Sequence, residues 1–199
     1  MTVVEIGEPQ NELTQRQRWS HYFVLLYALV AVVIGINLRD AALNASAVYT
    51  NVEAGIRAQY PQRWLIDTDG DYIFRVRDMT RIGFKTTIQV ATRPIARNTT
   101  VRNLVDSLTL DRSQTLAAYG VINTEPFMLP NEVEATAMTY TYVQSELNPY
   151  LQSLPTVIEG LDILTVEGDQ AIIITFLSEV SQYEQTLPIF ERFLGTLEF

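Results

Sequence analysis

Carboxylates are the side chains in this sequence whose spacing could support acid-base chemistry. Glu132 and Glu134 stand two positions apart, which places them on one face of a strand, and Glu125 lies shortly before them. Acid-base catalysis at neutral pH needs one carboxyl group whose pKa is raised by burial, and the neighbouring residues do not predict burial. We therefore expect hydrated surface acids here, and we predict that the protein is not an enzyme.

Other catalytic and metal-binding chemistry is limited by residue content. The chain has one histidine, His21, and no cysteine. A Ser-His-Asp or Cys-His site after His21 is thereby excluded, as is a zinc site built on imidazole or thiolate in that region. The sequence also has no GxGxxG, GxxxxGK(S/T) or GxSxG motif. We predict no cofactor and no catalytic or metal-binding residue.

A short acidic run, Asp67-x-Asp69-Gly70-Asp71, partly matches a calcium-binding loop. In such loops the glycine occupies the sixth position, whereas here it occupies the fourth. The residues that follow alternate as a strand, which a set of loop ligands cannot do. A tight turn, which favours Asp and Gly for backbone reasons, is the better interpretation.

The net charge is −9, which argues against a nucleic-acid partner because phosphate-rich ligands require an excess of Lys and Arg. Residues 41–102 nevertheless carry nine basic and five acidic groups, whereas residues 103–199 carry two basic and fourteen acidic groups. Basic residues that gather in space would bind lipid phosphates or an acidic partner. The alternative is that each is hydrated or paired with a carboxylate of the acidic half. The candidate binding residues are Arg75, Arg77, Arg81, Lys85, Arg93 and Arg97.

The longest apolar run, residues 22–38, contains no charged side chain. As a helix it covers about 25 Å, and the residues before it extend it toward the roughly 30 Å apolar core of a bilayer. We predict one transmembrane helix over residues 19–39, in contact with membrane lipid. Ala28, Ala31 and Gly35 form a small-residue stripe that could contact another helix, with ordinary lipid-facing variation as the alternative. The predicted anchor residues are Trp19, Tyr22, Phe23, Leu25, Leu26, Leu29, Val32, Val33 and Ile36.

Charges on either side of this helix predict its orientation. Arg16 and Arg18 precede it, while Arg39 follows it and is paired with Asp40. The positive-inside rule then places the N-terminus in the cytoplasm. The predicted parts are a cytoplasmic tail (1–18), the helix (19–39), a linker (40–52) into which the helix could continue by a turn or two, and an extracytoplasmic domain (53–199).

A cleaved signal peptide is the alternative to a retained anchor. Ala45-Ser46-Ala47 fits the small-residue cleavage pattern, and cleavage there would leave a domain beginning at Val48. The long acidic segment before the apolar run, the length of that run and the charges after it favour retention.

Apolar periodicity predicts the strands of the domain. Strand 170–177 is apolar on both faces, so it should lie centrally with helices above and below. Tyr140 and Tyr142, on one strand face, are expected to pack in the core. The predicted strands are 56–60, 72–78, 86–91, 121–125, 134–143, 157–166 and 170–177.

Two helices complete the predicted domain. The first is capped by Thr99 or Thr100, runs to about Tyr119 and is ended by Gly120. The second opens with a capping box at residues 181–184, is offset or restarted at Pro188, and ends near residue 194. The order of elements predicts an α+β protein, in which an α/β/α sandwich with a mostly antiparallel sheet follows the transmembrane helix.

Two patches of the domain resemble the PsbP/Mog1-type family. Gly55-Ile-Arg-Ala-Gln-Tyr-Pro-Gln-Arg-Trp64 is similar to that family's strand followed by a Tyr/Ile-Pro-x-x-Trp corner, and Tyr183-Glu-Gln-Thr-Leu-Pro-Ile-Phe-Glu-Arg-Phe193 is similar to its ending. The resemblance covers residues 49–199 and implies an α/β/α sandwich. It also implies non-catalytic work, because PsbP-like proteins are mostly extrinsic subunits or assembly helpers of membrane complexes, best known on the lumenal side of photosystem II. The chain differs from the lumenal members in its predicted crossing and in having no metal-binding histidine.

We therefore expect a non-catalytic, single-pass accessory or assembly subunit whose outer domain docks on other subunits of a membrane protein complex. The alternative is a tethered module that binds a small ligand or envelope component, which a closed apolar pocket between sheet and helix would favour. An enzyme would instead require a buried pair of acids lining such a pocket.

Overall fold

The chain divides into two compact units, Met1–Ala45 and Ser46–Phe199, and each is described by itself. A computed structural model describes residues 15–96, 99–130, 132–145 and 154–199.

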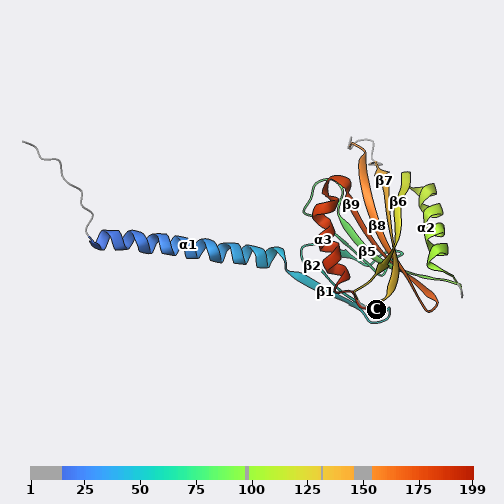
Figure 1. Ribbon diagram of the computed structural model, residues 1–199, viewed down its shortest axis with the longest axis horizontal. Coiled ribbons are helices and arrows are strands. Elements are labelled where there is room, and N and C mark those ends of the chain that lie inside the picture. Colours follow the sequence, from blue (N-terminus) through green and yellow to red (C-terminus); the bar gives the residue numbers. More distant parts are fainter. Residues whose placement is uncertain (1–14, 97–98, 131, 146–153) are drawn as a thin grey trace, which may run out of the picture. The chain divides into compact units, whose positions relative to one another are not determined.

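The described part of the first unit is a single helix, α1 (Gln15–Leu43) (Figure 1). Within it, Trp19–Leu43 is a candidate membrane span of 25 residues, none of which is buried by the rest of the protein. At ~1.5 Å per residue this span is about 37 Å long, which exceeds the ~30 Å apolar core of a bilayer. The side chains of the predicted anchor residues are 50–67% exposed, so the apolar surface of α1 is uncovered.

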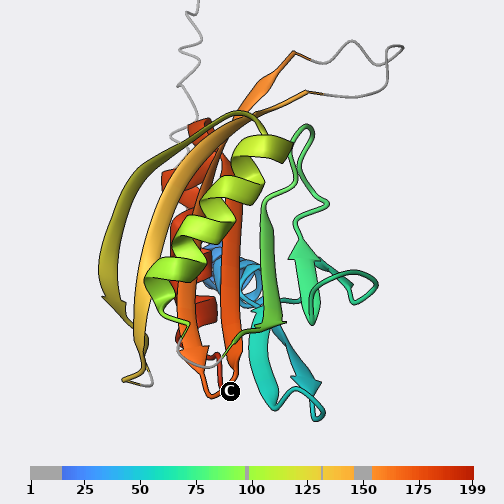
Figure 2. The same ribbon diagram turned by 90° about the vertical axis from the view of Figure 1, so that its right-hand side faces the viewer.

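The second unit contains a seven-stranded sheet in the order β3-β4-β5-β9-β8-β7-β6, and every neighbouring pair is antiparallel. Figure 2 shows α2 lying across one face of this sheet with α3 behind the other. This arrangement confirms the predicted α+β architecture. The strands are β3 (Leu65–Asp67), β4 (Phe74–Arg77), β5 (Thr87–Pro94), β6 (Ala117–Met128), β7 (Glu134–Gln144), β8 (Thr156–Glu167) and β9 (Gln170–Glu179).

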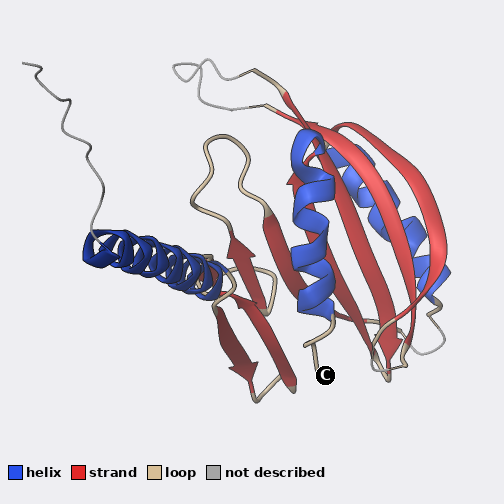
Figure 3. Ribbon diagram, turned by 60° about the vertical axis from the view of Figure 1, so that its left-hand side comes forward, coloured by secondary structure: helices blue, strands red, loops and turns tan. Residues whose placement is uncertain are grey.

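A separate antiparallel hairpin, β1 (Ser46–Asn51) and β2 (Ile56–Pro61), lies beside the main sheet (Figure 3). The sequence predicts a linker over residues 40–52 into which the helix could continue. Residues 40–43 are the last residues of α1, and residues 46–51 form β1, a strand that was not predicted. Their small and polar side chains give no strong apolar alternation. The strand forms because pairing with β2 satisfies its backbone groups, and the paired residues are five to fifteen positions away in the sequence.

β9 is the fourth of the seven strands, as its two apolar faces predict. Ile172, Ile174 and Phe176 pack in the core beneath α3. Ala171 and Ile173 alternate with them and belong to the second core, beneath α2. The central strand therefore contributes to both apolar layers, which explains why its sequence has no polar face.

α2 (Val101–Thr115) begins at Thr100, whose Oγ1 accepts a hydrogen bond from the backbone N–H of Asn103 at 3.3 Å. This confirms the predicted cap. The helix ends short of the predicted Tyr119, because Leu116 is extended and the chain turns into β6. Gly120 is part of β6 and does not stop the helix. The helical spacing of Leu116 is misleading, since it packs against the α2 core from an extended backbone.

α3 (Tyr183–Leu194) follows a single turn of 3-10 helix, η1 (Val180–Gln182), and starts differently from the prediction. No side chain caps it, and the Ser181 hydroxyl instead donates to Glu179 Oε1 at 2.8 Å. The predicted capping box at residues 181–184 is therefore wrong. Pro188 lies inside a continuous α3 and does not restart it. The carbonyl group left without an amide partner belongs to Glu184, which is exposed, so water can bond it.

Candidate functional site

Four of the predicted basic residues lie on β4 and in the loop that follows it. Arg75 and Arg77 alternate with the buried Phe74 and Val76, so both side chains point away from the α3 core. They converge on Asp67 of β3, whose Oδ2 lies 2.6 Å from Arg75 Nη2 and 3.5 Å from Arg77 Nη2. The structure therefore brings two guanidinium groups together at one carboxylate.

Asp67 is fixed by the acidic turn that follows it. The backbone N–H of Asp69 donates to Asp67 Oδ1 at 3.0 Å, and the Tyr72 hydroxyl donates to Oδ2 at 2.8 Å. The guanidinium of Arg75 also stacks over the Tyr72 ring, 4.6 Å from its centroid. The hydrogen bond from Asp69, followed by those from Arg75 and Tyr72, lowers the pKa of Asp67 to about 2. The run thus forms a turn whose first carboxylate is ionised and orders the two arginines.

A solvent-open groove of about 300 Å³ lies over Arg75 and Arg77. The Nε atoms of both residues are buried and have no hydrogen-bond partner among the described groups. Lys85 also lines this groove, so three cationic side chains line it, and two of them share the carboxylate of Asp67. This surplus can hold a carboxylate or phosphate group. The other walls are Gly83, Phe84, Thr87, Gln89, Tyr142, Gln144 and Leu177.

The β4–β5 loop, residues 78–86, carries Arg81 and Lys85. Arg81 Nε lies 3.3 Å from Asp78 Oδ2, and Thr80 donates to Asp78 Oδ1 through both its backbone N–H and its hydroxyl. Lys85 Nζ donates to the carbonyl oxygen of Arg81. The carboxylate partners of these cations are thus Asp67 and Asp78, which belong to the basic segment itself and not to the acidic half of the chain.

The other two predicted basic residues are Arg93 and Arg97. Arg93 is exposed on β5, where it pairs with Ala171 of β9. Six residues along a strand separate it from Thr87 at the groove, a distance of about 20 Å. Arg97 lies outside the described residues. The structure therefore gathers Arg75, Arg77, Arg81 and Lys85, and we call these four residues the basic cluster.

The three glutamates considered for acid-base chemistry are exposed and are not brought together. Glu125 pairs with Ala137, which points into the α3 core, whereas Glu134 alternates with the buried Ala135 and lies on the opposite face. Glu132 precedes β7 with a φ of 63°, in the left-handed region. These residues do not form a buried acidic pair.

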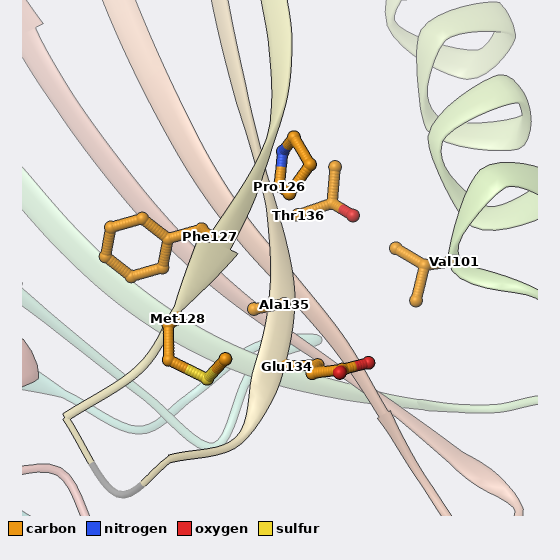
Figure 4. Close-up of a pocket in the computed structure, with 7 residues that line it drawn as sticks. All are labelled: Val101, Pro126, Phe127, Met128, Glu134, Ala135 and Thr136. Carbon is orange, nitrogen blue, oxygen red and sulfur yellow. The ribbon is translucent and has the colours of Figure 1, made fainter.

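A second groove, of about 490 Å³, lies between the start of α2 and the β6–β7 pair (Figure 4). Val101 reaches toward it from α2, while Pro126 and Thr136 come from the two strands. Glu134 is the one charged residue among those that Figure 4 labels. The groove is open and of mixed polarity, and so differs from the closed apolar pocket that a small-ligand module would need.

Sequence reasoning missed a buried ion pair in the α2 core. Arg112 of α2 contacts Asp162 of β8, which is fully buried. Thr175 Oγ1 donates to Asp162 Oδ1 at 2.8 Å, and the Arg112 guanidinium lies 4.4 Å from the centroid of the Tyr140 ring. Burial disfavours the charge on Arg112, but Asp162 outweighs that effect and raises the pKa of Arg112. The pair joins helix to sheet inside the fold.

Two sequence signals could have revealed this pair. Asp162 stands in β8 on the same face as Ile158 and Leu164, which is an inward position in an alternating strand. Arg112 falls four residues after the buried Leu108, on the apolar face of α2. Opposite charges on two buried faces that pack together indicate an ion pair.

Comparison with known proteins yields a fold but no family assignment. No protein-family model and no curated protein matches the sequence. The chain is similar to the solution structure of cyanobacterial PsbP (CyanoP) from Synechocystis sp. PCC 6803, with a TM-score of 0.51 and 16% identity over 77% of this chain and 92% of that one. This likeness confirms the PsbP/Mog1-like fold.

Two further structures are similar to the chain at a lower level. The Ran-binding protein Mog1p of Saccharomyces cerevisiae gives a TM-score of 0.49 and 9% identity over 77% of this chain and 95% of that one. A Pseudomonas aeruginosa protein of unknown function gives a TM-score of 0.49 and 10% identity over 78% of this chain and 98% of that one. The fold assignment rests on the likeness to cyanobacterial PsbP, which shows a PsbP-like α+β fold.

Proposed function

We propose that the chain is a non-catalytic, single-pass membrane protein whose domain docks on a larger membrane protein complex as an accessory or assembly subunit. The observation that carries this proposal is the uncovered apolar surface of Trp19–Leu43. Such a helix is stable in lipid, where its backbone groups are bonded internally and its side chains need no water. Only Asn44 and Ala45 stand between α1 and β1, so the tether between anchor and domain is short.

The pairing of β1 supports a retained anchor over a cleaved signal peptide. Ser46 pairs with Pro61 and Ala47 pairs with Tyr60. Cleavage after Ala47 would remove both residues from β1 and leave the end of β2 without its partner strand. A retained helix keeps the hairpin whole. In the proposed orientation, which follows the positive-inside rule, the N-terminus is in the cytoplasm and the domain is outside.

Docking is favoured over catalysis by the state of the buried acids. In the described ranges these are Asp78 and Asp162, and each is paired with an arginine. Their oxygen atoms are therefore engaged inside the fold and are not presented to a bound molecule. The fold is shared with cyanobacterial PsbP, and the sequence resemblance attributes extrinsic and assembly subunits to that class.

The test uses the full tagged chain in membranes of its own cells. We expect the chain to stay with the membranes at alkaline pH, and to migrate in mild detergent with other subunits in fixed proportion. A mature chain that begins near Val48 and leaves the membranes would overturn the anchor. Migration as a lone monomer would overturn the accessory role and favour the tethered module for a small ligand or envelope component.

A further inference from the structure

The β4–β5 loop exposes two large apolar side chains. Ile82 is 98% exposed and Met79 is 49% exposed. Single exposed apolar residues are ordinary on protein surfaces. Two on one loop, with basic residues around them, match the composition of segments that lie in the membrane interface.

Basic residues flank these apolar side chains in the sequence. Arg81 and Lys85 lie on either side of Ile82 in the sequence, and Arg77 ends β4 just before the loop. Asp78 is the one carboxylate of the loop, and it is buried and paired with Arg81. The bond from Lys85 Nζ to the Arg81 carbonyl fixes the loop backbone near Ile82. The loop therefore presents a positive, partly apolar surface of defined conformation.

Strand pairing places this loop at the end of the domain where the chain enters from α1. Ser46, the first residue of β1, pairs with Pro61, the last residue of β2. A turn closed by the bond from Trp64 N–H to the Pro61 carbonyl leads to Leu65, which begins β3. Leu65 pairs with Arg77, the last residue before the loop. Within the domain, Ser46 and the β4–β5 loop thus lie at corresponding ends of neighbouring elements.

We propose that the β4–β5 loop is a second membrane contact, which lays Met79 and Ile82 in the interface of an anionic bilayer with Arg81 and Lys85 at the level of the lipid phosphates. The proposal rests on the proposed function only in requiring that α1 is anchored. Apolar side chains gain from leaving water, and each cation is attracted by the negative surface. Because α1 already holds the chain at the bilayer, even a weak contact is populated through its high effective concentration.

Val52 provides a matched control for this contact. It is 90% exposed in the β1–β2 turn, which is close to the exposure of Ile82. Its neighbour Glu53 is acidic, and the turn lies at the end of β1 opposite to Ser46. If the bilayer contact requires neighbouring cations and a position at the same end of the domain as Ser46, Val52 should stay in water.

The chain has no cysteine, which permits single-site labelling of the full-length protein. Met79→Cys and Val52→Cys each receive a polarity-sensitive fluorophore, and the chain is reconstituted into nanodiscs of phosphatidylglycerol and phosphatidylcholine that contain spin-labelled lipid. We expect blue-shifted, strongly quenched emission at position 79 and unquenched emission at position 52. Ile82→Ser in the Met79→Cys background should lower the quenching. Arg81→Gln and Lys85→Gln should each lower the partition ratio of the loop about fivefold.

Each result decides a separate question. A chain that fails to co-elute with nanodiscs contradicts the anchor in the proposed function. A co-eluting chain whose label at position 79 is quenched no more than that at position 52 contradicts the second contact alone. Equal quenching in pure phosphatidylcholine contradicts the role of the cations. Protection of position 79 only in native membranes, and not in lipid nanodiscs, would mean a protein partner and overturn the proposal.

Discussion

Arg112 of α2 and Asp162 of β8 form an ion pair in the core between the helix and the sheet. The Asp162 side chain is fully buried and that of Arg112 is 15% exposed. With both charges largely removed from water, each depends on the other for compensation. Thr175 completes the site by donating to Asp162 Oδ1 at 2.8 Å. The pair therefore favours one position of α2 over others that apolar packing alone would allow.

Removing one member of this pair should be costly. Arg112→Met leaves an uncompensated buried carboxylate and should lower the free energy of unfolding by about 3–5 kcal/mol. Urea unfolding of the full chain in detergent micelles measures this loss. The double variant Arg112→Met/Asp162→Leu should lose less stability than the sum of the losses in the two single variants, because neither charge is then buried without its partner. Arg93→Met, on the exposed end of β5, is the control, and strict additivity of the pair would contradict the prediction.

Gly160 makes room for the ring that packs under Arg112. It pairs with Tyr140 across β7 and β8, and a Cβ atom at position 160 would lie 2.3 Å from Tyr140 Cζ. Gly160→Ala should therefore lower the free energy of unfolding by about 1–3 kcal/mol through overpacking. Gly120→Ala in β6, where a Cβ atom meets nothing within 4 Å, should be neutral. Equal effects at the two glycines would show that strand propensity, and not the Tyr140 contact, determines the cost.

The ordering of Arg75 and Arg77 by Asp67 should be lost at acidic pH. The pKa of Asp67 is lowered from 3.8 to about 2 by hydrogen bonds in the folded state. Its contribution to stability is therefore complete above about pH 4–5 and is lost as the pH falls toward 2. A carbon-13 titration of the Asp67 carboxyl group checks this, and Tyr72→Phe should move the midpoint upward. A midpoint near 3.8 in the unmodified chain would mean that the bonds to Asp67 do not persist in solution.

Local sequence patterns determine much of this fold. The two apolar faces of β9 predict a central strand, and the Thr100 cap predicts the start of α2, because both signals act over a few residues. β1 and the end of α2 were not predictable in this way. Ser46–Asn51 becomes a strand only through pairing with β2, and Leu116 packs against the α2 core although its backbone is extended.

The candidate site, too, could be predicted only in part. The sequence identifies the basic residues but not their partners, since Asp67 is brought to Arg75 by the pairing of β3 with β4. Charge counting over the two halves of the chain suggested carboxylates from the acidic half. The actual partners are local in sequence, because an antiparallel hairpin places neighbouring segments side by side.

Charges in the middle of α1 test the anchor independently of the domain. Leu29 and Val32 lie within the candidate span, and each charged residue near a bilayer centre costs about 2.5–3.5 kcal/mol on insertion scales. Val32→Asp should reduce the fraction of chain that stays with membranes at alkaline pH, and Leu29→Asp/Val32→Asp should release nearly all of it. Leu43→Asp, at the end of the span, should have little effect. If the double variant stays in the membrane pellet at neutral pH but is removed by salt, the cations of the β4–β5 loop hold it there. If it also resists alkaline extraction, α1 is not the anchor.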